Sequence, residues 1–250
     1  MAKQAGMGDN LYVGGNDLSG DTGSLSRIAG GIATYEKPSI SDYAMSRIGG
    51  LRDGGIDWGT YFNPSAGQAH PVLSALPTAD TLVTYCRGTA LGSPAACLVA
   101  KQVNYDGTRG ADGDFNLAVA AVANRRGLEW GKQLTAGSRT DTEATNGTGV
   151  DFAAGASFGL QLYLQVTALT GTDATFTVQQ SSDNGSTDAF AAVTGGAFTA
   201  VTAVPAWQRL QTARDQAVER YLRVVSSTSA GFTSVTFNVV AVFNKTTVNF

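Results

Sequence analysis

The sequence predicts an all-β protein with little helix, folded as a β-sandwich or barrel. Apolar and polar residues alternate with a period of two in many short runs, which is the pattern of half-buried strands. Turn-forming stretches rich in Gly, Asp and Asn separate these runs, and the chain contains 31 glycines. About seven such runs in the last hundred residues, with turns at roughly 8–12-residue intervals, indicate a sandwich.

The first 63 residues are Gly-rich, and pairs such as Gly14-Gly15 and Gly30-Gly31 interrupt short apolar pieces. This composition predicts an irregular arm, which a neighbouring molecule would hold in place. Alternation of Ile56, Trp58 and Thr60 with polar or small residues predicts a strand at 54–62. The remaining elements expected before residue 135 are a short helix at 69–76 and strands at 81–88, 95–105 and 114–123.

The C-terminal part reads as a second set of strands. Leu160, Leu162 and Leu164 alternate with polar or aromatic residues, which predicts a strand over 158–167. Ser182-Asp-Asn-Gly185 is a strong turn signal. Further strands are expected at 174–180, 189–193, 197–203, 206–212, 219–226 and 232–243.

The segment 136–156 lacks periodicity and is rich in Gly, Thr, Ala and Asp, so it is the best candidate for a boundary. We therefore expect a β domain over 1–135 that carries the Gly-rich arm, and a linker or long loop over 136–156. Residues 157–250 would form a second β-sandwich or the second half of the same barrel.

Charged residues make up 15% of the chain, against about 25% in typical domains. Lys and Glu are the scarcest, with five and four copies beside 12 Arg and 16 Asp. Protein interfaces are depleted in Lys and Glu and keep Arg and aromatic residues. The composition therefore favours a surface that is covered by other protein, although Gly- and Thr-rich β proteins of low charge are also common.

The net charge is −3, with no basic stripe that could neutralise phosphates, which argues against sequence-specific nucleic-acid binding. No run approaches the roughly 20 apolar residues that span a bilayer. The N-terminus lacks the apolar core of a secretory signal. We expect no membrane association and no export by that route.

The residues that usually carry catalysis are sparse, and we expect no enzyme, no cofactor and no metal. The single histidine, His70, precedes Pro71 and lacks a recognisable triad context. Aspartates 106, 112 and 114 could supply oxygens to Ca²⁺, but their spacing suits a Gly-rich turn better. Cys86 and Cys97 lie in apolar runs, so buried thiols are expected rather than a metal or redox motif.

Several phrases of the sequence resemble those of a known family. They are NDLSGDTGSL at 16–25, RIGGLRDG at 47–54, FNPSAGQAHP at 62–71, TYCRGTALG at 84–92, VAKQVNYDGTRG at 99–110 and GLEWGKQLT at 127–135. The chain resembles the major tail proteins, which are the tail-tube subunits of long-tailed, non-contractile phages of actinobacteria. The resemblance runs through nearly the whole chain, is densest over residues 10–135, and consists of structural phrases rather than a chemical signature.

This resemblance implies a β-sandwich or barrel of tail-tube type whose subunits form hexameric rings. The rings would stack into a hollow virion tube, assembled in the host cytoplasm, that conducts the genome. The implied partners are the chain itself, a tape-measure protein in the lumen, other tail proteins at the tube ends, and DNA that passes without specific binding. The extra residues of 150–250 would decorate the tube or complete its domain.

Candidate contacts between subunits lie near the end of the Gly-rich arm. The polar candidates are Arg47, Arg52 and Asp53, and the candidate apolar anchors are Trp58, Tyr61 and Phe62. Ordinary packing within one subunit explains them equally well. The alternative functions are a capsid decoration protein or minor tail protein, and a glycan-binding β-sandwich with exposed Trp or Tyr side chains beside a groove.

Overall fold

The computed structural model describes residues 8–76 and 78–244. Within these residues the fold is all-β, as predicted, with one five-residue helix, α1 (Ala69–Leu73). That helix is too short to cross a membrane. The strands are β1 (Asn10–Val13), β2 (Asn16–Asp17), β3 (Thr22–Glu36), β4 (Arg47–Tyr61), β5 (Thr81–Cys86), β6 (Pro94–Arg109), β7 (Phe115–Ala123), β8 (Glu129–Gln133), β9 (Arg139–Asp141), β10 (Thr145–Asn146), β11 (Val150–Asp151), β12 (Leu160–Thr170), β13 (Ala174–Ser181), β14 (Ala191–Ala197), β15 (Ala206–Gln211), β16 (Tyr221–Thr228) and β17 (Ser234–Phe243).

The chain forms two compact units, each built from segments that are far apart in the sequence. The described part of unit 1 consists of residues 8–19, 84–97 and 130–244, and unit 2 of residues 20–83 and 98–129. Strands β5 and β6 contribute residues to both units. A chain division at 136–156 therefore stays a prediction, to be tested by expressing the parts separately.

Unit 1 contains a sandwich of two antiparallel sheets. One sheet runs in the order β15-β12-β17 and continues through β8, and the other runs in the order β10-β16-β13-β14. Apolar side chains from both sheets form one core; Phe176 of β13 and Phe237 of β17 meet there with ring centroids 4.4 Å apart. Burying such large apolar side chains is the main favourable term in forming the sandwich.

The first seven residues of β12, Leu160–Val166, are buried on both faces of the strand. Leu160, Leu162 and Leu164 enter the sandwich core, as the alternation predicts. The opposite face is also buried, and Gln165 lies there with 1% of its surface exposed. Its amide accepts a hydrogen bond from the Gly15 N–H at 2.6 Å and donates one to Thr84 Oγ1 at 3.1 Å. The N-terminal segment of unit 1 therefore belongs to the folded body.

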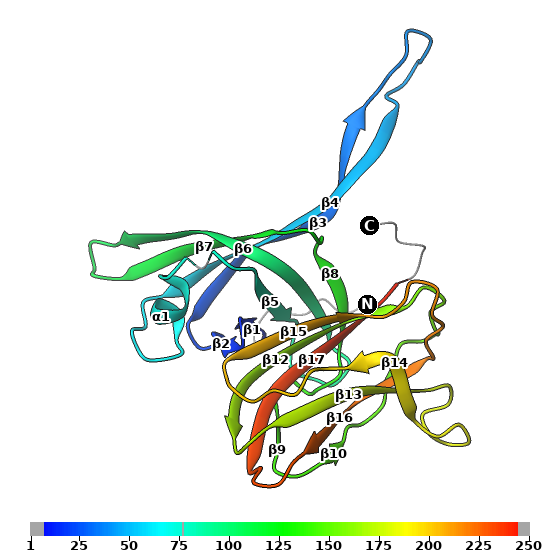
Figure 1. The fold of residues 1–250 in the computed structure, drawn as a ribbon. Helices are drawn as coiled ribbons and strands as arrows, with labels where there is room; N and C mark the ends of the chain where they lie inside the picture. Colours follow the sequence, from blue (N-terminus) through cyan, green and yellow to red (C-terminus); the bar gives the residue numbers. More distant parts are fainter. Residues whose placement is uncertain (1–7, 77, 245–250) are drawn as a thin grey trace. The chain divides into compact units, whose positions relative to one another are not determined.

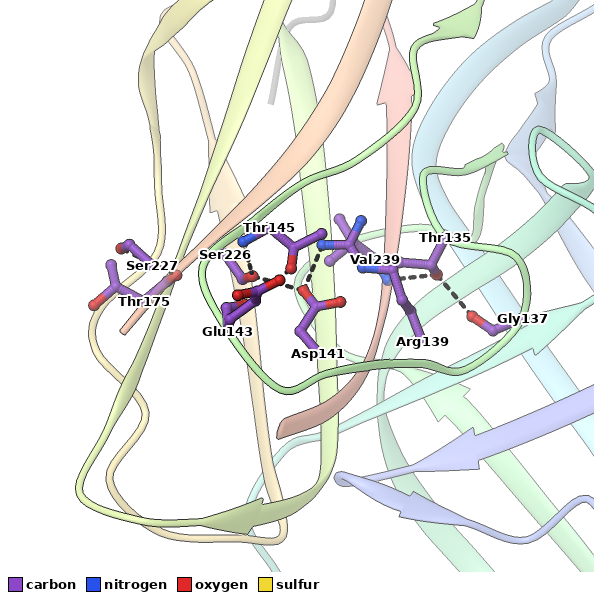
Figure 2. A network of polar contacts seen from close by, with 10 residues as sticks. All are labelled: Thr135, Gly137, Arg139, Asp141, Glu143, Thr145, Thr175, Ser226, Ser227 and Val239. Carbon is purple, nitrogen blue, oxygen red and sulfur yellow. Dashed lines mark hydrogen bonds and ion pairs between the residues drawn. The ribbon is translucent and has the colours of Figure 1, made fainter. Parts of the chain in front are cut away.

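Polar contacts fasten the start of the segment that was expected to be a linker (Figure 2). Strand β9 pairs with β17, and β10 pairs with β16, so this segment joins the edges of both sheets. The buried carboxylate of Asp141 accepts hydrogen bonds from Arg139 Nη2 at 2.7 Å and Ser226 Oγ at 2.6 Å. The backbone N–H of Thr145 donates to the same Ser226 hydroxyl at 3.2 Å. These bonds compensate for burying the Asp141 charge between the sheets.

Unit 2 is a sheet in the order β3-β4-β7-β6, with α1 near its edge. Asp21 connects the start of β3 with this helix. Its carboxylate accepts hydrogen bonds from the backbone N–H of Ala69 and from Asn63 Nδ2, both at 2.8 Å. Its carbonyl oxygen accepts one from Thr60 Oγ1 at 2.9 Å. The end of β4 and the start of α1 are thereby held by one residue.

The prediction of an irregular arm over residues 1–63 is wrong for the described residues. Leu11, Tyr12 and Val13 are buried in unit 1, and residues 22–36 and 47–61 form two paired strands. Composition misled the prediction because glycine is unfavourable in strands in general, while particular contacts at β3 and β4 require it.

The single strand β14 replaces the two strands expected at 189–193 and 197–203. Gly195, with a φ of 76°, lies within it, where the pairing with β13 shifts register before Ala197 pairs with Thr177. The expected helix is present but ends at Leu73 rather than at residue 76. Cys86 and Cys97 are buried thiols that form no disulfide among the described residues, and burial raises the pKa of the Cys86 thiol.

Candidate assembly surface

Strands β3 and β4 form an antiparallel hairpin whose outer half has no cover. Pairing runs from Thr22 opposite Thr60 to Glu36 opposite Arg47. At about 3.3 Å per residue, strands of this length span about 50 Å. Figure 1 shows the hairpin extending beyond β6 and β7, the other strands of its unit. Strand β7 pairs only with Gly55–Tyr61 of β4, so residues 47–54 have β3 alone beside them among the described strands.

The inner half of the hairpin belongs to the core of unit 2. Ile56 is fully buried, Trp58 is 2% exposed, and Thr60 is 1% exposed. Their alternation along β4 directs these side chains to one face of the sheet. The hairpin is therefore anchored firmly at its base.

Two glycines, Gly30 and Gly54, separate the buried half of the hairpin from its exposed half, and we call this point the waist. Gly30 lies directly opposite Gly54 in the register. The chain at Leu128 crosses here so closely that a Cβ on Gly54 would lie 2.7 Å from both the Cβ and the backbone N of Leu128. Gly30 has Leu128 at 3.1 Å by the same measure. At Gly54 any side chain would force the backbone of Leu128 to move, which explains part of the Gly-rich composition.

Beyond the waist the hairpin is exposed throughout, since every residue from 30 to 49 is exposed. Tyr35 and Ile48 are 55% and 56% exposed and lie opposite each other in the ladder. Leu51 is 82% exposed. The tip carries Ile40 and Tyr43, whose side chains are completely exposed. An isolated two-stranded hairpin is only marginally stable in water. Burying the exposed apolar side chains of this arm against another molecule would add stability.

The polar residues that the sequence singled out lie along this arm. Arg47 pairs with Glu36 at 3.3 Å across the ladder, and both side chains are 54% exposed. Arg52 lies 4.0 Å from the buried carboxylate of Glu129. Asp53 accepts a hydrogen bond from the N–H of Gly54 at 2.8 Å. Arg47, Arg52 and Asp53 are all exposed, so they are accessible to a partner.

The three aromatic candidates have different surroundings. Trp58 packs inside unit 2, whereas Tyr61 and Phe62 are 50% and 44% exposed. Phe62 lies 4.6 Å from the ring of His70 and 5.7 Å from that of Phe115, so it belongs to a small aromatic cluster at the other end of β4. The six candidates therefore do not form one patch, and their role in contacts between subunits stays a prediction.

Sequence reasoning missed the apolar residues of the outer hairpin, which are the main feature of this surface. They are Ile32, Tyr35, Ile40, Tyr43, Met45, Ile48 and Leu51. The signal was present as apolar residues dispersed among glycines at 30–55. These residues do not alternate with a period of two, and nothing in the sequence shows that no other strand covers them.

The aspartates of the loop at 106–114 accept local hydrogen bonds. Asp106 accepts one from Asn104, and Asp112 accepts one from the backbone N–H of Asp114. Asp114 accepts one from Asn116 at 2.6 Å. These contacts are typical of turn geometry. Across residues 8–76 and 78–244, no three His, Cys, Asp or Glu side chains gather in a way that could hold a metal ion.

Comparisons with known proteins give only distant likenesses. No protein-family model matches the chain, and no curated protein is similar to it. The crystal structure of the Dit protein of phage SPP1, described as a hub of the adsorption apparatus, matches at 9% identity over 93% of this chain and 98% of that chain, with a TM-score of 0.34. Two structures of the phage p2 baseplate in its activated conformation, with Sr and with Ca, match at 10% identity. They cover 95% and 96% of this chain and 99% of those chains, with TM-scores of 0.35 and 0.32. Likenesses at this level do not establish a common fold or function.

Proposed function

We propose that the protein is a structural subunit of a phage tail and that it works by assembling with copies of itself. In this proposal the subunits form rings that stack into the tail tube, and the tube conducts the genome. The supporting observation is the outer β3–β4 hairpin, an ordered arm with exposed apolar side chains along its length and at its tip. The resemblance of the sequence to major tail proteins gives the proposal its direction.

Burial of the exposed apolar side chains of the arm would drive such an assembly. Exposed apolar surface is ordinary when residues are scattered, but a contiguous set on one projecting element indicates an interaction site. The arm also has two unpaired strand edges, which a soluble monomer normally protects with charge. Between residues 30 and 55 the charged side chains are Glu36, Lys37, Asp42, Arg47, Arg52 and Asp53. Most of them lie at the tip or the waist, which leaves the middle of the arm uncharged.

The test is negative-stain electron microscopy of the purified protein together with sedimentation velocity over a range of concentrations. We expect rings or tubes of uniform width. Replacing Tyr35 and Ile48 with Ser removes exposed apolar surface and should shift assembly to at least about tenfold higher concentration, because less apolar area is buried.

Val103→Ser is the matched control, since Val103 is 57% exposed on β6 of the same unit and lies outside the arm. It should assemble like the wild type. A chain that stays monomeric at every concentration contradicts the proposal. Closed trimers alone would favour the decoration-protein alternative instead.

A further inference from the structure

Unit 1 contains an apolar groove that the proposed assembly has not used. The groove has a volume of about 590 Å³ and lies between β8, the loop after β11 and the end of β17. This volume falls within the range of about 300–1,000 Å³ found for binding sites. The aromatic residues that line it are Trp130, Phe152, Phe158 and Phe243. Trp130 is 52% exposed, so a large apolar ring is presented to solvent at its edge.

The walls of the groove are held in place by local contacts. The rings of Phe152 and Phe243 stack with centroids 4.2 Å apart. Lys132 Nζ donates a hydrogen bond to the carbonyl oxygen of Asp151 at 2.7 Å and lies 5.4 Å from the centroid of Phe152. Asn244 Nδ2 donates to the carbonyl oxygen of Phe158 at 2.8 Å. A preformed site loses less entropy when it binds a partner.

The hairpin tip presents apolar side chains of the kind that such a groove can bury. A ten-residue loop, 37–46, connects β3 to β4, and the Lys37 N–H closes its base by donating to the Ser46 carbonyl at 2.8 Å. Within the loop, Asp42 Oδ2 accepts a hydrogen bond from the Ser39 N–H at 2.7 Å. Ile40 and Tyr43 project from this loop fully exposed. One chain therefore carries an ordered apolar protrusion as well as an apolar recess.

One pair of opposite charges fits the same pairing. Among the described residues that line the groove, Lys132 is the one that carries a charge. The neighbouring carboxylate of Asp151 is occupied by Arg220, which donates two hydrogen bonds to it at 2.7 and 2.6 Å. The tip presents Asp42 beside Tyr43. Residues 36–47 carry two acidic and two basic side chains, so the attraction to Lys132 is local to Asp42, while the apolar side chains Ile40 and Tyr43 enter the groove.

We propose that the groove at Trp130 is the receptor for the hairpin tip, Ile40 to Tyr43, of a second copy of this chain. The contact joins two different surfaces of identical molecules, so it is heterologous. Such contacts propagate into rings where the rotation closes, and into filaments where it does not. The inference rests on the proposed self-assembly and specifies one of its interfaces.

Two complementary variants test the inference. In the tip variant, Ile40→Asp and Tyr43→Asp replace the apolar side chains of the tip with charged ones. In the groove variant, Trp130→Glu adds a charge that repels Asp42. Each should associate at least about tenfold more weakly than the wild type. Mixed in equal amounts they should bind each other more tightly than either variant binds itself, because the intact tip of the groove variant still matches the intact groove of the tip variant. Val103→Asp is the matched control for adding a charge at an exposed apolar position, and it should assemble normally.

The outcomes separate the inference from the proposed function. If both variants assemble like the wild type, the tip-to-groove contact is wrong while self-assembly stands. If the wild type itself never assembles, the proposed function fails. A synthetic peptide of residues 36–47, added to the tip variant, then decides the inference alone.

Peptide binding should shift the fluorescence of the exposed Trp130 to shorter wavelength, and a peptide with Asp at positions 40 and 43 should bind at least about tenfold more weakly. Absence of a shift overturns the inference. Binding of soluble oligosaccharides at Trp130 in place of the peptide would also overturn it, since the groove would then be a glycan site.

Discussion

The carboxylate of Asp9 accepts several hydrogen bonds that stabilise the N-terminal segment of unit 1. Its carboxylate accepts hydrogen bonds from Tyr85 Oη at 2.5 Å, Arg87 Nη1 at 2.8 Å and the Gly88 N–H at 2.7 Å. Partial burial alone would raise the pKa of Asp9, but the hydrogen bonds from Tyr85, Arg87 and Gly88 outweigh it and hold the pKa below its usual value. The group ties the first described residues to the end of β5.

This geometry predicts a pH-dependent loss of stability in the Asp9→Asn variant. Because the folded-state pKa is lowered, the contribution of Asp9 is complete above the unfolded pKa of about 3.9 and is lost as pH falls through the folded value. At neutral pH the variant should lose about 1–3 kcal/mol of unfolding free energy.

Urea unfolding at neutral pH and near pH 3, under conditions that keep the chain monomeric, measures this effect. The difference from the wild type should shrink at the lower pH. Asp112→Asn, on an exposed loop, is the control and should change stability by less than about 0.5 kcal/mol. A difference that does not depend on pH would show that the charge of Asp9 is not the cause.

The hairpin is the element on which the proposed function depends, and its waist is the part most sensitive to substitution. Gly54→Ala places a Cβ 2.7 Å from the backbone N of Leu128, and the neighbouring backbone has to move. Overpacking of this kind costs about 1–3 kcal/mol. We expect a lower thermal midpoint for Gly54→Ala and a weaker attachment of the arm.

Gly31→Ala is the matched control for this substitution. Gly31 lies one residue beyond the waist in the same hairpin, and a Cβ there would have nothing within 4 Å. Its free energy of unfolding should change by no more than about 0.5 kcal/mol, as for an ordinary surface substitution, so its thermal midpoint should stay close to that of the wild type. Equal destabilisation of both variants would mean that glycine at the waist acts through backbone freedom rather than through the contact with Leu128.

At the scale of the whole molecule, the shortage of charge predicts how assembly responds to salt. Charged residues are 15% of the chain and the net charge is −3, so electrostatic repulsion and attraction between subunits are both small. Apolar burial is insensitive to screening, while sulfate strengthens it. Assembly measured by sedimentation should therefore persist in about 1 M NaCl, where the Debye length is about 3 Å.

The same experiment with ammonium sulfate should lower the concentration at which assemblies appear. The tip-to-groove contact should weaken slightly in NaCl, because the attraction between Asp42 and Lys132 is screened. Dispersal of all assemblies by moderate NaCl would contradict an interface dominated by apolar side chains.

Local alternation was enough to locate most strands, because a period of two with bounding turns appears directly in the sequence. Strand β12 was expected at 158–167 and is found at Leu160–Thr170, and the inward side chains Leu160, Leu162 and Leu164 were assigned correctly. The expected turn at Ser182–Gly185 also follows β13 directly. Wherever a strand packs one face on a core, its pattern records that packing.

The hairpin and the groove could not be read in this way. In the outer half of β3 and β4 no core selects an alternating pattern, and Gly54 is required by Leu128, 74 residues later in the chain. The groove joins Trp130, Phe152 and Phe243, which only folding brings together. The amino-acid sequence by itself thus determined the all-β class, the strand faces and the low-charge surface, since these depend on neighbours along the chain. Tertiary structure alone decided which strands remain uncovered and where the recess lies, because these depend on contacts between segments far apart in sequence.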